Sequence, residues 1–451
     1  MRSRFAARGA LLGLLLVTLF AGGLRGYALS SPGAVVWDEW FYARDACLEV
    51  KGPVKACHRV HEQSTVHPPL GKRLIGIGIR LFGFTPFGWR IAAWAAGTLT
   101  VALLYLLALR LFGSAGWALF SAGLLATDPL HFVHSRTAML DVFVTLFVVA
   151  ATLFAVLDRD RDRGGGLFRP WLALCGISVG LAIASKWSGV LIILGLLPLF
   201  VAWAPPGQRR RAALTAATWL VVVPAVVYTA SYAGRLHAGV LDWPSAFARR
   251  QLHMLRFHID LSSGQQYQSR PWEWLAIKRP IAYFFTDYGG RYREVIAIGT
   301  PFVWWPGAMG VLVAVWSTLR ARSARGAAPV IAACGCACYL PWFALASDRG
   351  FVFITYILPA VPFLCLGAAL LARRLWSTRL PGRAVVSIVT AMAVGWFVFY
   401  YPVLTARPLS SSEWQQRIFL RDCGRAMTQT KYGPAPVIFT FEYPPTGWCW
   451  A

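Results

Sequence analysis

The sequence predicts an all-α integral membrane protein that crosses the bilayer about eleven times. Of its 451 residues, 57% are hydrophobic and only 14% are charged, and the mean hydropathy is +0.53. A soluble domain has roughly 45–50% apolar residues. Apolar runs close to the roughly 17–25 residues that span a bilayer also recur along the whole chain. These runs lie near residues 9–29, 89–110, 117–134, 137–157, 171–186, 188–204, 213–233, 296–319, 328–346, 351–372 and 385–403.

The first run has the basic start and apolar middle of a secretory signal peptide. We expect it to be retained as the first transmembrane helix. A cleaved signal is the alternative, because the uninterrupted apolar stretch before Arg25 is short.

The positive charges indicate the orientation of the chain. The formal net charge of +25 is carried by arginines in short runs between apolar segments, which favours membrane topology and anionic lipid over nucleic acid. Basic connectors at 207–212, 319–326 and 372–383 fall on the same side of the predicted topology as the N-terminus. By the positive-inside rule this side is cytoplasmic, so we expect a multi-pass protein of the plasma membrane.

The other side of the membrane receives three longer segments. The predicted organisation is an N-terminal transmembrane half (1–233) with an outer loop at 30–88, a second outer loop (234–295), C-terminal transmembrane helices (296–403) and an outward-facing tail (404–451). The histidines also gather in or beside these outward segments. This asymmetry is typical of an enzyme that works at the outer face of a membrane, or of a receptor.

The second outer loop predicts an amphipathic helix with one apolar and one basic face. Such a helix either lies on the membrane surface or packs onto the rest of the protein. The apolar face consists of Ala248, Leu252, Leu255 and Ile259, and the basic face of Arg249, His253 and Arg256.

The first outer loop carries an adjacent acidic pair in "VVWDEWFYARDA" (35–46). Asp38 and Glu39 lie between two tryptophans, where a membrane surface is expected. Carboxylates are costly to hold near hydrocarbon, so the pair is either well solvated or kept for chemistry. One carboxylate of such a pair can remove a proton from an incoming hydroxyl.

Cations follow the acidic pair at the outer ends of the next spans. An anionic leaving group can be bound by the cations Arg90, Arg136 and Lys186. Arginine binds a phosphate through its planar guanidinium, and lysine binds it as a point charge. The sequence contains no GxxxxGK[ST] loop for a soluble nucleotide, so these cations predict a lipid phosphate. They occur in "FGWRIAAW" (87–94), "DPLHFVHSRTAMLD" (128–141) and "IASKWSG" (183–189).

Simpler interpretations remain open for these residues. Asp141 and Arg136 can form a structural buried pair, Lys186 can extend its amine to the interface, and Asp38 and Glu39 can be ordinary loop charges.

Histidines and cysteines leave further alternatives. Either His58 and His61, or Asp128 with His131 and His134, could bind a metal, although the ligand spacing is loose. On the oxidising side, two cysteine pairs could form disulfides. These pairs are Cys47 with Cys57, and Cys423 with Cys449.

Several motifs recur in a characteristic order and spacing. They are "WDEWFYARDA", "VHPPLGKRLIGIG", "FGWRIAAW", "HSRTAMLD", "ASKWSG", "SRPWEWLAIKRPIAYFF", "IGTPFVWWPG", "FITYILPAVPFLCLG" and "PLSSSEWQQRIF". Together they resemble the protein O-mannosyltransferase family, and its bacterial branch in particular. The resemblance implies a multi-spanning glycosyltransferase of the GT-C type. It implies inverting transfer of mannose from a polyprenyl-phosphate carrier to Ser or Thr of secreted or membrane proteins, without a required metal, and we expect no cofactor.

The resemblance also maps functional residues onto this chain. The family's catalytic acidic pair corresponds to Asp38, predicted as general base, and Glu39, predicted to position acceptor or sugar. Phosphate binding by Arg90, Arg136 and Lys186 is inferred from their charge. The residues predicted to position donor or acceptor are His67, Pro68, Lys72, Asp141 and Trp187. The expected partners are the lipid-linked donor, acceptor proteins, membrane lipids and the protein secretion machinery, and no nucleic acid.

Two departures from the family and two other functions bear on this interpretation. The segment 234–295 is too short for the luminal sugar-binding-like domain of eukaryotic members, and the stretch 432–451 matches nothing in the family.

A related GT-C enzyme could instead transfer a lipid-linked sugar to glycolipid or wall polysaccharide. A lipid or sugar transporter would also have many spans, but transporters commonly contain internal repeats, and we find none.

Overall fold

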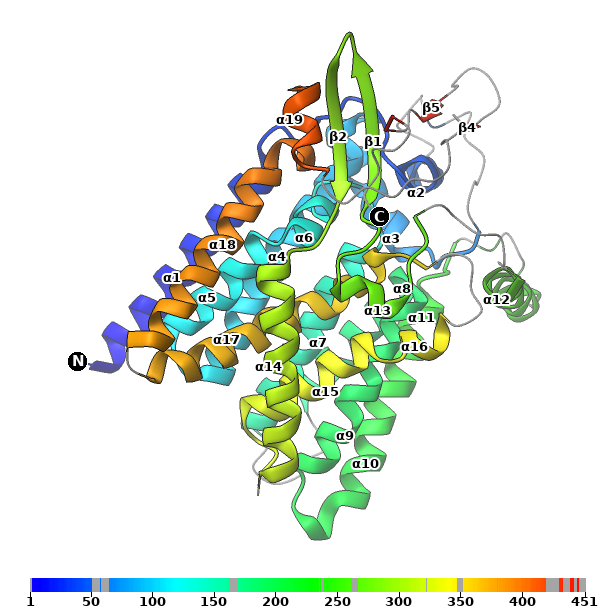
Figure 1. The fold of residues 1–451 in the computed structure, drawn as a ribbon. Helices are drawn as coiled ribbons and strands as arrows, with labels where there is room; N and C mark the ends of the chain where they lie inside the picture. The colour runs from blue at the N-terminus through cyan, green and yellow to red at the C-terminus, as the bar shows by residue number, and fades with distance from the viewer. Residues whose placement is uncertain are drawn as a thin grey trace.

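The computed structural model is an elongated bundle of helices with a small sheet at one end (Figure 1). Most helices run roughly along the length of the bundle, and the hairpin β1–β2 projects from its upper end in that view. The structure describes residues 2–50, 57, 65–161, 169–234, 236, 239, 241–260, 267–321, 323–346, 352–378, 380–418, 430–432, 439–441 and 444–445.

The N-terminal half supplies the first group of apolar helices. Their bounds are α1 (Arg2–Gly26), α4 (Pro86–Phe112), α5 (Ala115–Ala126), α7 (Asp141–Arg161), α8 (Pro170–Ser185), α9 (Ile193–Trp203), α10 (Arg209–Ala217) and α11 (Val223–Ala230). The C-terminal half adds α14 (Pro301–Arg320), α15 (Ala327–Tyr339), α16 (Trp342–Leu345), α17 (Val361–Ser377) and α18 (Leu380–Leu404).

These helices confirm the predicted membrane protein and most of the predicted spans. Within the described residues, eight helical segments are long and apolar enough to cross a membrane, and three shorter apolar helices accompany them at Ala115–Ala126, Pro170–Ser185 and Trp187–Trp203. The exact count of eleven spans stays a prediction. The helix α5 is shorter than the predicted span because Asp128 caps a separate helix, α6 (Pro129–His134), which begins with proline.

Small residues allow close packing within the bundle. A Cβ atom on Gly310 of α14 would collide with the backbone of Gly367 in α17. The two helices therefore meet backbone to backbone, a contact typical of membrane helices.

The outer loop 30–88 forms two helices, α2 (Glu39–Cys47) and α3 (Leu70–Phe82). A disulfide joins Cys47 to Cys57, which is one of the two pairings considered from the sequence. The other pair, Cys423 and Cys449, and also His58 and His61, lie outside the described residues.

The sheet was not predicted. The strands β1 (Ile281–Tyr288) and β2 (Arg291–Ala297) form an antiparallel hairpin, and β3 (Leu409–Ser410) pairs with the other edge of β2. Gly289 and Gly290 both have positive φ and form its two-residue turn. Because residues 296 and 297 belong to β2, the predicted span near 296–319 begins later, at Pro301.

The remaining elements are short. They are α13 (Pro271–Leu275), α19 (Ser411–Gln415), and the strand pair β4 (Thr430–Tyr432) and β5 (Phe439–Phe441). The basic connectors between α9 and α10 and between α14 and α15 lie at the opposite end of the bundle from the hairpin (Figure 1). This separation agrees with the predicted orientation.

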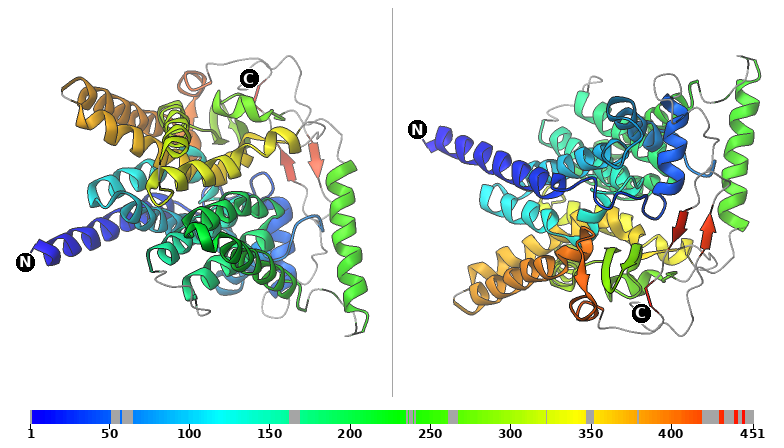
Figure 2. Two further views of the ribbon diagram at one scale, coloured as in Figure 1. Left: turned by 90° about the horizontal axis from the view of Figure 1, so that it is seen from below. Right: turned by 90° about the horizontal axis from the view of Figure 1, so that it is seen from above.

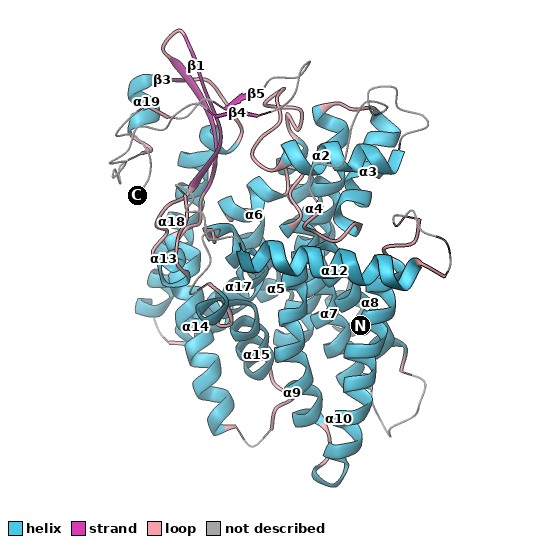
Figure 3. Cartoon of the chain, turned by 90° about the vertical axis from the view of Figure 1, so that its right-hand side faces the viewer, coloured by secondary structure: helices cyan, strands magenta, loops and turns pink. Residues whose placement is uncertain are grey.

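The predicted amphipathic helix is present as α12 (Trp243–Asp260). It lies along the outside of the bundle (Figure 2) and runs across the direction of the other helices (Figure 3). Polar contacts fix it to the protein: His253 to Thr65, His258 to the carbonyl of Val66, and Gln251 to Tyr228. Its apolar residues Leu252, Leu255 and Ile259 remain exposed, so the helix has both a docked face and a face available to lipid.

Candidate active site

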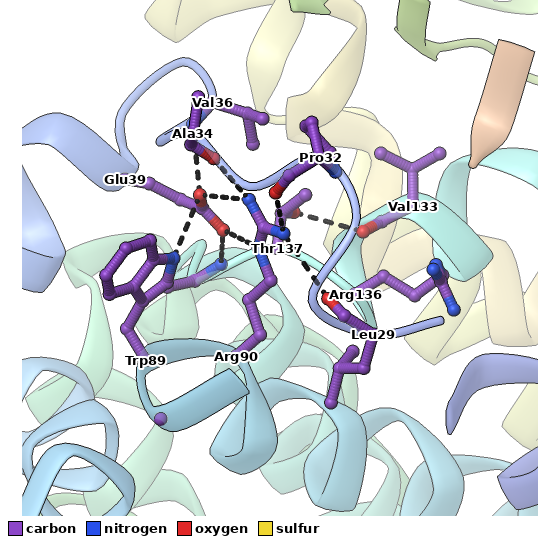
Figure 4. Close-up of polar contacts among 12 residues, drawn as sticks. Leu29, Pro32, Ala34, Val36, Glu39, Trp89, Arg90, Val133, Arg136 and Thr137 are labelled. Atoms are coloured by element: carbon purple, nitrogen blue, oxygen red, sulfur yellow. Dashed lines mark hydrogen bonds and ion pairs between the residues drawn. The ribbon is translucent and has the colours of Figure 1, made fainter. Parts of the chain in front are cut away.

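Glu39 lies at the centre of a buried polar cluster (Figure 4). Its carboxylate forms an ion pair with Arg90, with the Arg90 Nε 2.8 Å from Oε1 and Nη2 2.9 Å from Oε2. It also accepts hydrogen bonds from the Trp89 indole and from the backbone amides of Val36 and Ala138. With five such contacts and no exposed surface, Glu39 holds the first outer loop in place. Its predicted role in positioning acceptor or sugar stays a prediction.

Arg90 uses its remaining donors on the same loop. Its Nη atoms donate to the carbonyl oxygens of Leu29, Pro32 and Ala34 at 2.8–3.3 Å. All three guanidinium nitrogens are therefore engaged inside the protein, and the side chain is fully buried. The predicted role of Arg90 as a phosphate ligand is not favoured by this geometry, because a phosphate would have to displace these partners.

Arg136 makes similar contacts at the end of the first helix. Its guanidinium donates to the carbonyl oxygens of Arg25, Tyr27 and Ala28 and lies 5.3 Å from the ring centre of Phe132. It satisfies carbonyl groups that the end of α1 leaves without helical partners. These contacts are structural, and phosphate binding by Arg136 stays a prediction. Asp141 pairs with Lys186 rather than with Arg136.

Asp38 differs from Glu39 in being partly exposed. The Tyr42 hydroxyl donates to its Oδ2 at 3.3 Å. Burial raises the pKa of Asp38 to about 6, an effect opposed by the charge of Lys186 and by the Tyr42 hydrogen bond. A carboxylate with this pKa is ionised at neutral pH and can accept a proton.

Trp37 fixes the backbone immediately before Asp38. Its φ of +45° lies in the left-handed region, which is uncommon for a residue with a bulky side chain. The Trp37 amide donates to the carbonyl of Tyr283 at 3.0 Å, and the two rings stack with their centres 5.6 Å apart. Tyr267 and Phe353 contact the other sides of the indole, so residues of the C-terminal half help to hold the backbone next to Asp38.

Lys186 pairs with Asp141. The amine lies 2.9 and 3.0 Å from the two carboxylate oxygens and 4.5 Å from the ring centre of Tyr356. The charges of Lys186 and Asp141 both act on the pKa of Asp38. Lys186, one of the three predicted phosphate-binding cations, lines a cavity.

This cavity, which we call the Lys186 cavity, has a volume of about 510 Å³. Its polar lining comes from Lys186, His67, Ser188 and His258, and most of the exposed lining is apolar. Such a cavity can bind an anion with a long hydrocarbon tail, because the cation can contact the anionic group and the apolar wall can contact the tail. The apolar lining comes from Trp187, Val190, Leu191, Leu255, Ile259, Trp342, Ala344, Leu345 and Tyr356.

The other predicted positioning residues divide between the cavity and the structure around it. His67 lies between the rings of Tyr42 and His258, at 5.8 and 5.6 Å between ring centres, and Trp187 donates to the hydroxyl of Tyr228. Pro68 is buried beside His67, just before α3.

Lys72 has a structural partner. Its amine lies 2.8 Å from the carboxylate of Asp45, and both side chains are almost completely buried. This pair joins α2 to α3, so the geometry does not place Lys72 at the Lys186 cavity.

Sequence reasoning missed the tyrosines of the site. Tyr42 contacts Asp38, Tyr283 contacts both Trp37 and His134, and Tyr356 lies against Lys186. Tyr42 was detectable because it follows Asp38 by four residues on a predicted helix, a spacing that brings side chains together. The other two lie in the C-terminal half and gave no local signal.

The candidate metal ligands after α5 instead contact protein groups. Asp128 accepts from the His131 amide and the Trp304 indole, and His131 contacts Arg25. Within the described ranges, no group of three or more His, Cys, Asp or Glu residues has metal-binding geometry.

Comparison with known proteins identifies the family. Residues 15–238 match the model of dolichyl-phosphate-mannose-protein mannosyltransferases, and residues 244–422 match the C-terminal four-transmembrane region of protein O-mannosyltransferases. The polyprenol-phosphate-mannose–protein mannosyltransferase of Mycobacterium tuberculosis is 30% identical to this chain, with 87% of each chain covered. The chain belongs to the protein O-mannosyltransferase family. It is therefore a glycosyltransferase, and the resemblance seen in the sequence is confirmed.

Further relatives and solved structures agree with this assignment. The protein of the same name from Corynebacterium glutamicum is 32% identical over 80% of this chain and 81% of its own. The yeast Pmt1–Pmt2 complex bound to its sugar donor matches with a TM-score of 0.76 at 15% identity, covering 91% of this chain and 92% of that chain. ArnT from Cupriavidus metallidurans matches with a TM-score of 0.58 at 20% identity, covering 87% and 70%. These matches confirm the predicted GT-C fold.

Proposed function

We propose that this enzyme transfers mannose from polyprenyl-phosphate-mannose to Ser or Thr hydroxyls of proteins, with Asp38 as general base. The observation that carries the proposal is the position of a partly exposed, ionisable Asp38 close to the charges of Lys186 and Asp141, where Lys186 itself lines an apolar cavity. The names of the bacterial relatives support mannose as the sugar and proteins as acceptors.

The Lys186 cavity is the proposed donor site. The polyprenyl chain lies against the apolar wall that includes Leu255 and Ile259 of α12, and the phosphate contacts the Lys186 amine. Asp141 orients this amine through two hydrogen bonds. Glu39, Arg90 and Arg136 act indirectly in this account, because they hold the loop that carries Asp38.

The reaction then follows as a single displacement. Asp38 takes the proton of the acceptor hydroxyl as the hydroxyl oxygen forms a bond to C1 of mannose. The bond between C1 and the phosphate oxygen breaks, and polyprenyl phosphate leaves with the electron pair. Lys186 stabilises the negative charge that develops on the leaving phosphate. Attack from the face opposite the phosphate inverts the configuration at C1.

The outer face of the plasma membrane is the proposed location of this reaction. The Cys47–Cys57 disulfide supports an oxidising compartment. The basic connectors at the opposite end of the bundle support a cytoplasmic location for that end.

The function is tested with membranes that contain or lack the protein. They are given polyprenyl-phosphate-linked radiolabelled mannose and a peptide rich in Ser and Thr, and label on the peptide is counted after extraction of lipid. Label that depends on the protein and is released by β-elimination supports the proposal. If label reaches only lipid or polysaccharide, the protein still acts as a glycosyltransferase, but the proposal that its acceptor is a protein is contradicted.

A further inference from the structure

The charged groups around Lys186 do not carry a net positive charge. The Lys186 amine pairs with both carboxylate oxygens of Asp141, at 2.9 and 3.0 Å, so its charge is already balanced. The charges of Lys186 and Asp141 also act on Asp38, which brings a further negative charge to the same region. A donor phosphodiester adds one more negative charge, and a charge removed from water is costly unless it is paired. The bound donor therefore requires a second positive charge at this site.

Two imidazole rings line the Lys186 cavity together with Lys186 itself. His67 comes from the first outer loop and His258 from α12, and their ring centres lie 5.6 Å apart. Within the described part of the chain, no aspartate or glutamate lines the cavity. An unperturbed imidazole has a pKa of about 6.5 and changes its charge near neutral pH. The lining of the cavity can therefore become more positive by taking up a proton.

The contacts of His258 hold its ring at the cavity in either protonation state. Its Nε2 lies 3.0 Å from the carbonyl oxygen of Val66. A carbonyl oxygen only accepts hydrogen bonds, so Nε2 carries a hydrogen and donates. The same nitrogen is a donor when the ring is a cation. The ring of Trp187, the residue that follows Lys186, lies 5.9 Å from the His258 ring. Proton uptake by His258 therefore does not require the loss of the contact that docks α12.

The groups around the two histidines determine how many protons they hold. Two positive rings this close repel each other, and the Lys186 amine opposes a positive charge on either ring. We therefore expect one proton for the pair, and we expect it when an anion is bound. The other titratable or charged groups near the pair are Tyr42, Asp141 and Tyr356, together with His253, Arg256 and Asp260 of α12 itself.

We propose that the donor phosphate lies between the Lys186 amine and the His67–His258 pair, and that the pair takes up one proton from water when the donor binds. The inference rests on the proposed function and adds a phosphate contact from α12 to its donor site. The negative phosphate stabilises the imidazolium, and the imidazolium in turn pairs with a phosphate oxygen. The outer amphipathic helix thus contributes to recognition of the charged group as well as of the hydrocarbon chain.

Calorimetry of the wild-type enzyme tests the proton uptake. Polyprenyl-phosphate-mannose is titrated into the full-length protein in detergent near neutral pH, without acceptor, in two buffers that differ in their enthalpy of protonation. The donor is a phosphodiester and does not change its own protonation there, so the difference in heat reports protons bound by the protein. We expect uptake of about 0.5–1 proton per donor bound. Donor binding without proton uptake would overturn the inference.

Variants distinguish the histidines from Asp38 as the group that takes up the proton. His67→Gln/His258→Gln removes both titratable rings, and the glutamine at 258 can still donate to Val66. We expect it to lose the proton uptake and to bind the donor about tenfold more weakly, with unchanged affinity for uncharged polyprenol. Asp38→Asn should retain the uptake. Uptake that is lost in Asp38→Asn and kept in the histidine variant would assign the proton to Asp38 and contradict the inference.

The matched control is a third histidine of α12. His253 contacts Thr65 on the outside of the protein, and His253→Gln should leave both the donor affinity and the proton uptake at the wild-type values. Equal weakening of donor and polyprenol binding in the double variant would show that the histidines only dock α12, against the phosphate contact. If the wild type binds no donor at all, the donor site of the proposed function is itself contradicted, and this inference with it.

Discussion

The backbone amide of Trp37 donates a 3.0 Å hydrogen bond to the carbonyl oxygen of Tyr283. This contact joins the residue before the proposed base to a strand of the C-terminal half. Together with the stacked rings, it holds a left-handed backbone conformation that costs a non-glycine residue of order 1–3 kcal/mol. The position of Asp38 therefore depends on both halves of the chain.

The Tyr283 ring is predicted to act as a positioning group. Tyr283→Ala removes the stacking surface, and we expect kcat to fall about 100-fold with the donor KM nearly unchanged, because a displacement of about 1 Å in a catalytic group can cost that much. Tyr283→Phe retains the ring and loses the contacts of the hydroxyl with His134 and Thr355. We expect it to stay within a few-fold of wild type, and a Phe variant as impaired as the Ala variant would assign the effect to the hydroxyl instead.

The pH dependence of transfer should report Asp38. Because burial raises its pKa to about 6, kcat/KM is expected to fall about tenfold per pH unit below 6 and to level off above about 7, where the base is ionised. In Tyr42→Phe the carboxylate loses a hydrogen bond that lowers its pKa, so the acid limb should move to higher pH. A profile that is flat from about pH 5 to 8, or an unmoved limb in Tyr42→Phe, argues against Asp38 as the titrating base.

Lys186 is predicted to stabilise the leaving phosphate. Lys186→Met should lower kcat/KM by about 100- to 1,000-fold, the usual loss when one charge-stabilising group is removed. Removing one partner of a buried ion pair also destabilises a protein, so the double variant Lys186→Met/Asp141→Leu serves as the control. If the double variant recovers activity along with thermal stability, Lys186 acts only through its pair with Asp141.

Arg90 is predicted to act on stability rather than on donor binding. Arg90→Met leaves the buried Glu39 carboxylate without its cation and should cost about 3–5 kcal/mol of stability. The midpoint of thermal unfolding in detergent is the readout, and donor binding is measured on the fraction that remains folded. An unchanged midpoint with a large loss of donor affinity would restore the original prediction that Arg90 binds phosphate.

The membrane-spanning fold and several of the charged residues of the candidate site could be predicted from the sequence. Apolar runs identify the spans, since length and composition suffice for a membrane helix. The acidic pair and Lys186 were selected because ionisable groups are costly near hydrocarbon. The helix at 243–260 was expected from its two faces.

The partners of the charged groups were not predictable in the same way. Glu39 and Arg90 lie 51 residues apart, and charge alone does not distinguish a cation that faces a cavity from one that holds a loop. We therefore predicted one common role for Arg90, Arg136 and Lys186. In the structure Lys186 lines a cavity, whereas Arg90 and Arg136 contact backbone carbonyl groups. Tyr283 was missed because its contact with Trp37 depends on the tertiary arrangement of the two halves.

The central claim is that Asp38 acts as the base for transfer of mannose to protein. Asp38→Asn is compared with Glu413→Gln, which alters an exposed carboxylate in α19, in membranes with equal amounts of inserted protein. We expect label on the peptide to fall about 100- to 10,000-fold in Asp38→Asn and to stay near the wild-type level in Glu413→Gln. Near-normal labelling by Asp38→Asn would contradict it.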